Sequence, residues 1–228
     1  MLNTLLFGAF PYVAMMLFLL VSIERYIHAP FTFSSLSSQF LESKELFWGS
    51  VPFHLGILTL FFGHLFGFLF PRQMMLWDLL PIRLFILETS ALIAAMLTAV
   101  GLAGLILRRA TSARLRVNTT KLDVVVYVVL LFQIATGLWV AIGLRWGSAW
   151  YTQTVVPYLW SLFRFQPDIQ RVAELKLPAQ LHIVGAFVLF AVFSFTRLVH
   201  ALVAPVPYLW RPNQLVIWNR DRKTRAGK

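Results

Sequence analysis

The chain has 228 residues, of which 59% are hydrophobic and only 13% charged, and its formal net charge is +11. Soluble domains are usually about a quarter charged, so this chain cannot cover itself with polar side chains and lipid must form part of its surroundings. The absence of cysteine excludes disulfides, iron–sulfur clusters ligated by this chain and covalently attached c-type haem.

Five apolar segments have the length of about 20 residues that crossing a bilayer requires. In chain order they are residues 5–23, 46–70, about 84–107, 124–144 and about 181–204. Charged residues or prolines bound them, as is typical of membrane helices. The sequence therefore predicts an all-α integral membrane protein. We expect a bundle of five transmembrane helices in a single membrane domain, residues 1–228, with a basic tail from about residue 205.

The segments between the spans differ in character. No Lys or Arg precedes the first span, so we expect it to be retained rather than cleaved as a signal peptide. Residues 24–45 are polar and rich in serine, whereas residues 145–180 carry several Trp and Tyr side chains. Because these aromatic residues favour headgroup depth, we expect residues 145–180 to lie along the bilayer interface.

The basic residues predict the orientation. Six Lys and Arg residues lie on the side of the N-terminus and of residues 71–83 and 145–180, and thirteen lie on the opposite side. Since positive residues favour the cytoplasm, we expect the N-terminus outside and the C-terminus inside. The same charge indicates contact with anionic lipid, and no nucleic-acid partner is expected.

Four of the five histidines lie in two spans. His54 and His64 belong to the second, and His182 and His200 to the fifth. Ionisable groups inside a membrane are costly and are therefore functional candidates. A single histidine would more often be hydrogen-bonded to a neighbouring helix, but two on each of two helices favour ligation. His28 lies in a polar loop and is expected at the surface.

The spacing of the histidines predicts two pairs. Ten residues separate His54 from His64, about 15 Å along a helix, and eighteen separate His182 from His200, about 27 Å. Because the two helices are antiparallel, His54 pairs with His200 toward the cytoplasm and His64 with His182 toward the outside. The unequal separations strain this pairing, and helix tilt would have to absorb the difference. Two histidines fill both axial positions of a haem iron and favour electron transfer, whereas zinc would gather its ligands around one metal.

Other polar and small residues accompany the histidines. Arg197 precedes His200 by three residues, so a haem propionate is a candidate partner, and snorkelling to the interface is the alternative. Glu88 could accept quinol protons or lie at the watery outer end of its helix; we favour the second. Four glycines in these spans could admit a flat macrocycle or serve helix packing. They are Gly56, Gly63, Gly67 and Gly185.

Together these features resemble the gamma subunit of respiratory nitrate reductase, a membrane dihaem cytochrome b. The resemblance spans nearly the whole chain and includes the histidine spacings of ten and eighteen residues. The matching stretches are Ser-Ser-Gln-x-Leu at 37–41, Phe-His-Leu-Gly-Ile-Leu at 53–58, Phe-Gly-His at 62–64, Leu-Pro-Ile at 80–82, Arg-x-Arg-x-x-Thr-Thr-x-x-Asp at 114–123, Leu-His at 181–182, Arg-Leu-Val-His at 197–200 and Pro-Val-x-Tyr-Leu at 205–209.

The resemblance implies two b haems, an outer one ligated by His64 and His182 and an inner one ligated by His54 and His200. It implies that the chain is a multi-pass subunit of the cytoplasmic (inner) membrane that oxidises quinol near the outer face during anaerobic respiration. Electrons would pass through the inner haem to cytoplasmic partners, an iron–sulfur beta subunit and a molybdenum alpha subunit that reduces nitrate. No residue of this chain would act on nitrate itself.

One departure from the family concerns the quinol site. The family places a lysine early in the third span, where this chain has Phe85. Arg83 lies two residues earlier and is a candidate replacement, and Gly63 beside His64 is retained.

Two alternative functions stay open. One is a related dihaem subunit of another quinone-linked complex, either sulfite-reductase-linked or heterodisulfide-reductase-type. The other is a transporter or membrane anchor without haem. The basic tail, residues 211–228, is expected to bind a cytoplasmic partner or lipid.

Overall fold

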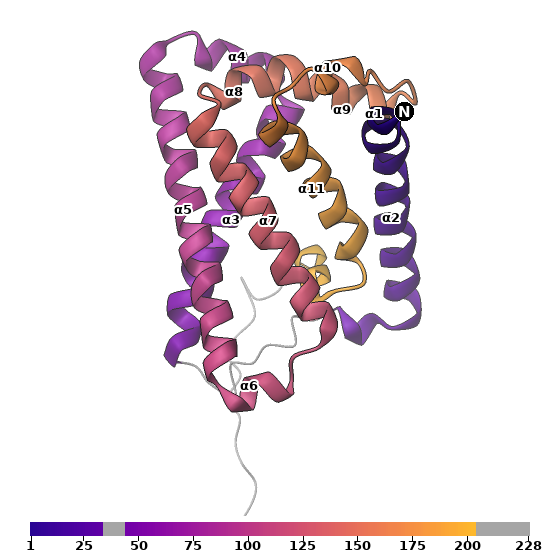
Figure 1. The fold of residues 1–228 in the computed structure, drawn as a ribbon, viewed down its shortest axis with the longest axis vertical. Coiled ribbons are helices and arrows are strands. Elements are labelled where there is room, and N and C mark those ends of the chain that lie inside the picture. Colours follow the sequence, from indigo (N-terminus) through magenta and orange to yellow (C-terminus); the bar gives the residue numbers. More distant parts are fainter. Residues whose placement is uncertain (34–43, 204–228) are drawn as a thin grey trace, which may run out of the picture.

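A computed structural model describes residues 1–33 and 44–203, with the side chains of residues 44–46 left out. These ranges are helical and contain no strand. Long helices run roughly side by side, and several short helices lie across one end (Figure 1). The serine-rich stretch at 37–41 and the basic tail lie outside the described residues.

Four helical segments are long and apolar enough to cross a membrane. They are residues Leu2–His28, which comprise α1 (Leu2–Thr4), the π-helical turn η1 (Leu5–Ala9) and α2 (Phe10–His28); Phe47–Leu69 within α3 (Lys44–Leu69); α5 (Pro81–Thr111); and α7 (Lys121–Gly143). Each predicted span from the first to the fourth therefore has a counterpart within a few residues of its expected ends. The chain is a multi-pass membrane protein.

The fifth predicted span differs from the expectation. Its α-helix, α11 (Leu177–Phe193), has 17 residues and ends well before position 204. Thr196 is extended, with φ −113° and ψ −178°, and a 3₁₀ segment, η4 (Arg197–Leu202), follows. A continuous helix over residues 181–204 was therefore the wrong expectation. Hydropathy reports composition and does not detect hydrogen bonds that end a helix inside an apolar segment.

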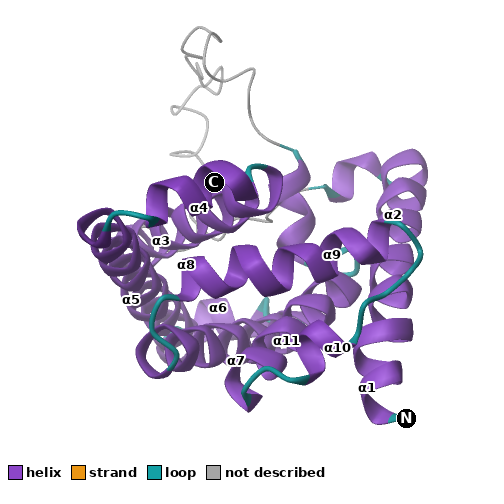
Figure 2. Ribbon diagram, turned by 90° about the horizontal axis from the view of Figure 1, so that it is seen from above, coloured by secondary structure: helices purple, strands orange, loops and turns teal. Residues whose placement is uncertain are grey.

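Short helices form a layer at the end where the N-terminus lies (Figures 1 and 2). They are α4 (Pro71–Asp78), α8 (Gly147–Trp150), the π-helical turn η3 (Tyr151–Val155), α9 (Val156–Phe163) and α10 (Gln170–Ala173). The aromatic side chains expected at the interface belong to this layer. Trp160 stacks on Phe68 with ring centres 4.9 Å apart, which ties α9 to the end of α3. At the opposite end, η2 (Pro30–Thr32) follows α2 and α6 (Ala113–Val117) joins α5 to α7.

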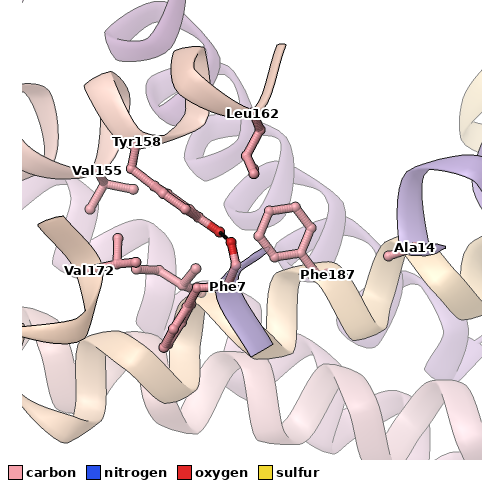
Figure 3. Packing of buried hydrophobic residues seen from close by; sticks show 8 residues of the cluster. Phe7, Ala14, Val155, Tyr158, Leu162, Val172 and Phe187 are labelled. Carbon is pink, nitrogen blue, oxygen red and sulfur yellow. Dashed lines mark hydrogen bonds between the residues drawn. The ribbon is translucent and has the colours of Figure 1, made fainter. Parts of the chain in front are cut away.

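The largest buried cluster joins this layer to the first and last long helices. Tyr158 of α9 is fully buried and donates a hydrogen bond from its hydroxyl to the carbonyl oxygen of Phe7, 2.8 Å away (Figure 3). Val155, Val172 and Phe187 pack around this contact. The cluster therefore fixes the short helices relative to α2 and α11.

Helices α3 and α5 are in close contact because glycines lie between them. A side chain at Gly101 of α5 would meet the backbone nitrogen of Phe53 and come within 2.8 Å of the carbonyl oxygen of Gly49. Gly56 similarly faces the backbone of α5 at Ala94 and Thr98. Small residues allow this approach in lipid, where no hydrophobic force drives two helices together.

Candidate functional site

The structure brings the four intramembrane histidines together in two pairs. His54 of α3 and His200 of η4 have ring centres 6.2 Å apart. His64 of α3 and His182 of α11 have ring centres 6.4 Å apart. These are the two pairings that the antiparallel arrangement predicts. In the part of the chain that the structure describes, no three His, Asp or Glu residues gather around one point.

Both separations suit a metal held between the two rings. Two imidazole nitrogens that bind one metal from opposite sides, each about 2 Å from it, place the ring centres about 6 Å apart. The ring planes are inclined by 68° in the first pair and by 43° in the second. The site therefore fits one metal per pair, held between α3 and the C-terminal helical segment.

Hydrogen bonds at Nδ1 orient the rings. Nδ1 of His54 donates to the carbonyl oxygen of Ser50 at 2.8 Å, and Nδ1 of His64 to that of Leu60 at 2.8 Å. Nδ1 of His200 donates to the carbonyl oxygen of Arg197, which lies 2.6 Å away in the same 3₁₀ segment. Because a carbonyl oxygen can only accept, Nδ1 must carry a proton, and in the neutral imidazole the lone pair is then on Nε2. Metal-binding histidines are commonly fixed in this way.

His182 reaches the same state through a hydroxyl group. Thr136 of α7 donates to the carbonyl oxygen of Phe132 at 2.9 Å, so its Oγ1 can accept from Nδ1 of His182, 3.2 Å away. The Gln133 amide lies 3.4 Å from Nε2 of His182 and also donates to the His182 carbonyl oxygen at 3.2 Å. The longer of these contacts is the one that a metal at Nε2 would replace.

Arg197 has a carboxylate partner within the chain. Its Nε lies 2.8 Å from Oδ1 of Asp123, and Nη1 of Arg109 lies 3.1 Å from Oδ2 of the same residue. The Asp123 side chain is only 7% exposed. It also forms a capping box with Thr120 at the start of α7. The expected contact of Arg197 with a propionate stays a prediction, and Asp123 supplies an anion for this partly buried arginine.

The glycines near the histidines have different surroundings. A side chain at Gly56 would meet α5, one at Gly67 would lie 3.0 Å from the Tyr151 ring, and one at Gly185 would meet Phe132 and Gln133 of α7. These three serve packing. Gly63 has nothing within 4 Å, so the surface beside His64 is open.

The other candidate quinol residue stacks on an aromatic ring. The guanidinium carbon of Arg83, at the start of α5, lies 5.1 Å from the ring centre of Trp77. Arg83 and Phe85 are both exposed. An exposed cation at the end of an apolar helix suits an interfacial position, and its participation in quinol binding stays a prediction.

The Glu88 carboxylate binds the layer of short helices at the N-terminal end of the bundle. It accepts a hydrogen bond from the Ser148 backbone N–H, 2.9 Å away at the start of α8. Asp78 lies nearby, and within the described ranges neither its carboxylate oxygens nor the Ser148 hydroxyl has a hydrogen-bond partner. Burial raises the pKa of Asp78, the charge of Glu88 raises it further, and the nearby Ser148 hydroxyl opposes both.

Comparison with known proteins identifies the family. The family model described as nitrate reductase gamma subunit matches residues 3–219. The chain belongs to this family. It is 34% identical over 219 residues to the respiratory nitrate reductase 2 gamma chain of Escherichia coli K12, covering 94% of this chain and 96% of that one. It is 33% identical over 213 residues to the nitrate reductase gamma chain of Bacillus subtilis 168, covering 91% and 94%.

A longer relative contains the same unit. The nitrate reductase-like protein NarX of Mycobacterium tuberculosis H37Rv is 36% identical over 217 residues, which are 93% of this gamma-family chain and 33% of NarX. The gamma-subunit unit therefore also occurs as part of a larger polypeptide.

Sequence reasoning missed one residue at the His64–His182 pair of this gamma-family chain. Tyr151 donates a hydrogen bond from its hydroxyl to the His64 carbonyl oxygen at 3.1 Å, and the two rings are 5.5 Å apart. Burial raises the pKa of Tyr151 to about 12, so it stays a donor at neutral pH. Its place in an aromatic loop segment indicated only an interfacial residue. The π-helical turn that begins at Tyr151 has no clear sequence signal.

Proposed function

We propose that this chain is the membrane subunit of a respiratory nitrate reductase that holds two b haems and takes electrons from quinol. One observation carries the proposal: two histidine pairs join α3 to the C-terminal helical segment, with ring centres 6.2 and 6.4 Å apart. His54 and His200 would ligate an inner haem, and His64 and His182 an outer one. Bis-histidine haem supplies electron transfer and leaves no coordination position open for oxygen.

The chain's own groups would prepare these sites. The carbonyl oxygens of Ser50, Leu60 and Arg197 and the hydroxyl of Thr136 fix each ring with Nε2 available. Hydrogen bonds of this kind also make the imidazole a better donor to a metal. The surrounding apolar helices exclude water, which favours electron transfer over side reactions.

The proposed direction of transfer follows from the layout. We propose that α11 and η4 together form a fifth crossing, with the end layer outside and the C-terminus in the cytoplasm. The six basic residues of the N-terminal side then lie outside and thirteen lie inside. Quinol would bind near Gly63, His64 and Arg83 and release its protons outside, while electrons would leave at the His54–His200 end.

The partners follow from family membership. The E. coli and B. subtilis relatives are named as gamma chains of nitrate reductase. We propose that the chain anchors an iron–sulfur beta subunit and a molybdenum alpha subunit on the cytoplasmic side of the inner membrane. These names favour nitrate reductase over a sulfite-reductase-linked or heterodisulfide-reductase-type complex. Truncation after Trp210 would release the partner subunits if the basic tail binds them, and would leave them in place if the tail binds only lipid.

Haem content tests the ligands. A reduced-minus-oxidised spectrum should give two b haems per chain. His64→Ala should leave one haem and abolish quinol oxidation, whereas His28→Ala, at an exposed histidine, should keep both. A His64→Ala protein that retains two haems would contradict the assignment.

Sealed vesicles test the direction. Each quinol should move about two charges across the membrane, at about 2.3 kcal/mol per charge for each 100 mV. Turnover should acidify the outer side and slow under an opposing potential. Acidification of the cytoplasmic side would overturn both the orientation and the order of the haems.

A further inference from the structure

The interruption between α11 and η4 settles the mismatch in histidine spacing. A continuous helix would separate His182 from His200 by about 27 Å, while their partners on α3 are about 15 Å apart. Both pairs nevertheless meet, with ring centres 6.4 and 6.2 Å apart. The chain achieves this because α11 ends at Phe193 and η4 does not continue its line (Figure 1). The interruption is therefore what brings His200 level with His54.

Arg25 of α2 holds the end of α11. Its Nη1 donates to the carbonyl oxygens of Ser194 at 2.7 Å and Thr196 at 3.0 Å. Its Nε and Nη2 donate to Oγ1 and the carbonyl oxygen of Thr32, at 2.9 and 3.0 Å. The last carbonyl groups of a helix lack partners within it, and in lipid they need another donor. The guanidinium of Arg25 supplies that donor and allows the helix to stop inside an apolar segment.

Asp123 of α7 holds the start of η4. Its buried carboxylate binds Nε of Arg197 at 2.8 Å and is itself fixed by Arg109 and by the capping box with Thr120. The Arg197 carbonyl oxygen in turn accepts the Nδ1–H of His200 at 2.6 Å. Asp123 is therefore connected to His200 through Arg197, whose side chain binds Asp123 and whose carbonyl oxygen binds the His200 ring.

We propose that Arg25 and Asp123 are positioning residues for His200, which together fix the helix interruption that makes the inner histidine pair possible. This inference rests on the proposed function, because it assigns the residues to the inner haem site. Neither residue touches the His54 or His200 rings in the contacts described above. Their effect passes through the backbone of residues 194–197.

Asp123→Asn and Arg25→Lys test the proposal. Asparagine keeps an acceptor for the Thr120 N–H, so α7 can still begin, but it removes the charge that holds Arg197. Lysine keeps the charge at position 25, but its single ammonium group cannot bind both Thr32 and the carbonyl oxygens of Ser194 and Thr196. Each variant should lose about half of the total haem, all from the inner site. Asp123→Glu should restore part of the loss.

The outer haem serves as an internal control. In both variants the outer haem should keep its spectrum and midpoint potential, which shows that the bundle has folded. Any inner haem that remains should have a shifted potential and a changed low-spin electron paramagnetic resonance signal, because that signal depends on the relative orientation of the two imidazole planes. Asp168→Asn, which removes an exposed pair with Arg171, should change neither haem.

Three results would overturn the inference. One is an inner haem with normal content, potential and resonance signal in both variants. A second is equal loss of both haems, because that would indicate a general folding defect. The third is no rescue by Asp123→Glu. A wild-type chain without haem would instead refute the proposed function, so the two failures are distinguishable.

Discussion

Replacing Gly56 by alanine should destabilise the bundle, because α3 and α5 meet backbone to backbone at this glycine. The new methyl group would meet Oγ1 of Thr98 and the carbonyl oxygen of Ala94 and lie 2.7 Å from the Thr98 nitrogen. Backbone atoms cannot rotate away, so the helices must separate. Overpacking typically costs about 1–3 kcal/mol. The higher helix propensity of alanine returns up to about 1 kcal/mol.

The net expectation is a loss of about 1–2 kcal/mol, which lowers the unfolding temperature by roughly 2–8 °C for a chain of this size. Gly63→Ala is the matched control, since Gly63 lies on the same helix with nothing within 4 Å. It should leave the unfolding temperature unchanged or raise it slightly. If Gly63 borders the quinol, this control should lower quinol oxidation without lowering stability.

Thermal unfolding of the purified protein in one detergent, followed by circular dichroism at 222 nm, measures both variants. The comparison needs no haem assignment, because the contact joins two helices directly. An unchanged midpoint for Gly56→Ala would refute the reasoning. So would an equal loss in Gly63→Ala, because the cost would then come from the residue type and not from the contact.

Three further changes test other contacts by the same measurement. Tyr158→Phe removes the hydroxyl that donates to the buried Phe7 carbonyl oxygen and should cost about 1–3 kcal/mol; no change would mean that water satisfies this oxygen. Thr120→Ala removes half of the capping box with Asp123 and should cost about 0.5–2 kcal/mol, and a smaller loss would show that the cap is dispensable. Asp78→Asn should raise the unfolding temperature at pH 7, since burial disfavours the charged form. Because the folded-state pKa is raised, the wild-type protein gains stability as pH falls through that pKa, and the advantage of the variant should shrink toward pH 4; a constant difference would refute this.

The positions of the long helices could be predicted from the sequence because lipid imposes a length and a composition on each span. The span expected at about residues 84–107 is the helix Pro81–Thr111 in the structure. It begins earlier because Pro81 suits a first helical turn, and it extends past residue 107 to include Arg109, which binds Asp123. The pairing of the histidines also followed from sequence, since antiparallel order alone decides which levels meet. Whether the pairs bind haem stays a prediction.

The interruption of the fifth helix could not be predicted in this way. Arg25, one of the two residues to which we attribute the interruption, lies 169 residues from Ser194 in the sequence. From the sequence alone it is only one basic residue in a polar connection. Ser194 and Thr196 are both compatible with a membrane helix, so nothing local announces the end of α11. Tyr151 was missed for a similar reason, because its contact with His64 joins residues 87 positions apart.

The short length of α11 has a consequence for the bilayer around the protein. Seventeen residues span about 25 Å, less than the roughly 30 Å of a typical hydrocarbon core, whereas the 31 residues of α5 span about 46 Å. Phe190 and Phe195 are exposed near the C-terminal end of α11, so apolar side chains line the surface there. The α11 helix alone therefore falls short of the hydrocarbon core and completes the proposed crossing only together with η4, while α5 accommodates its excess length by tilting or by extending past the headgroups. The helical length that the protein presents to the bilayer therefore varies around the perimeter of the molecule.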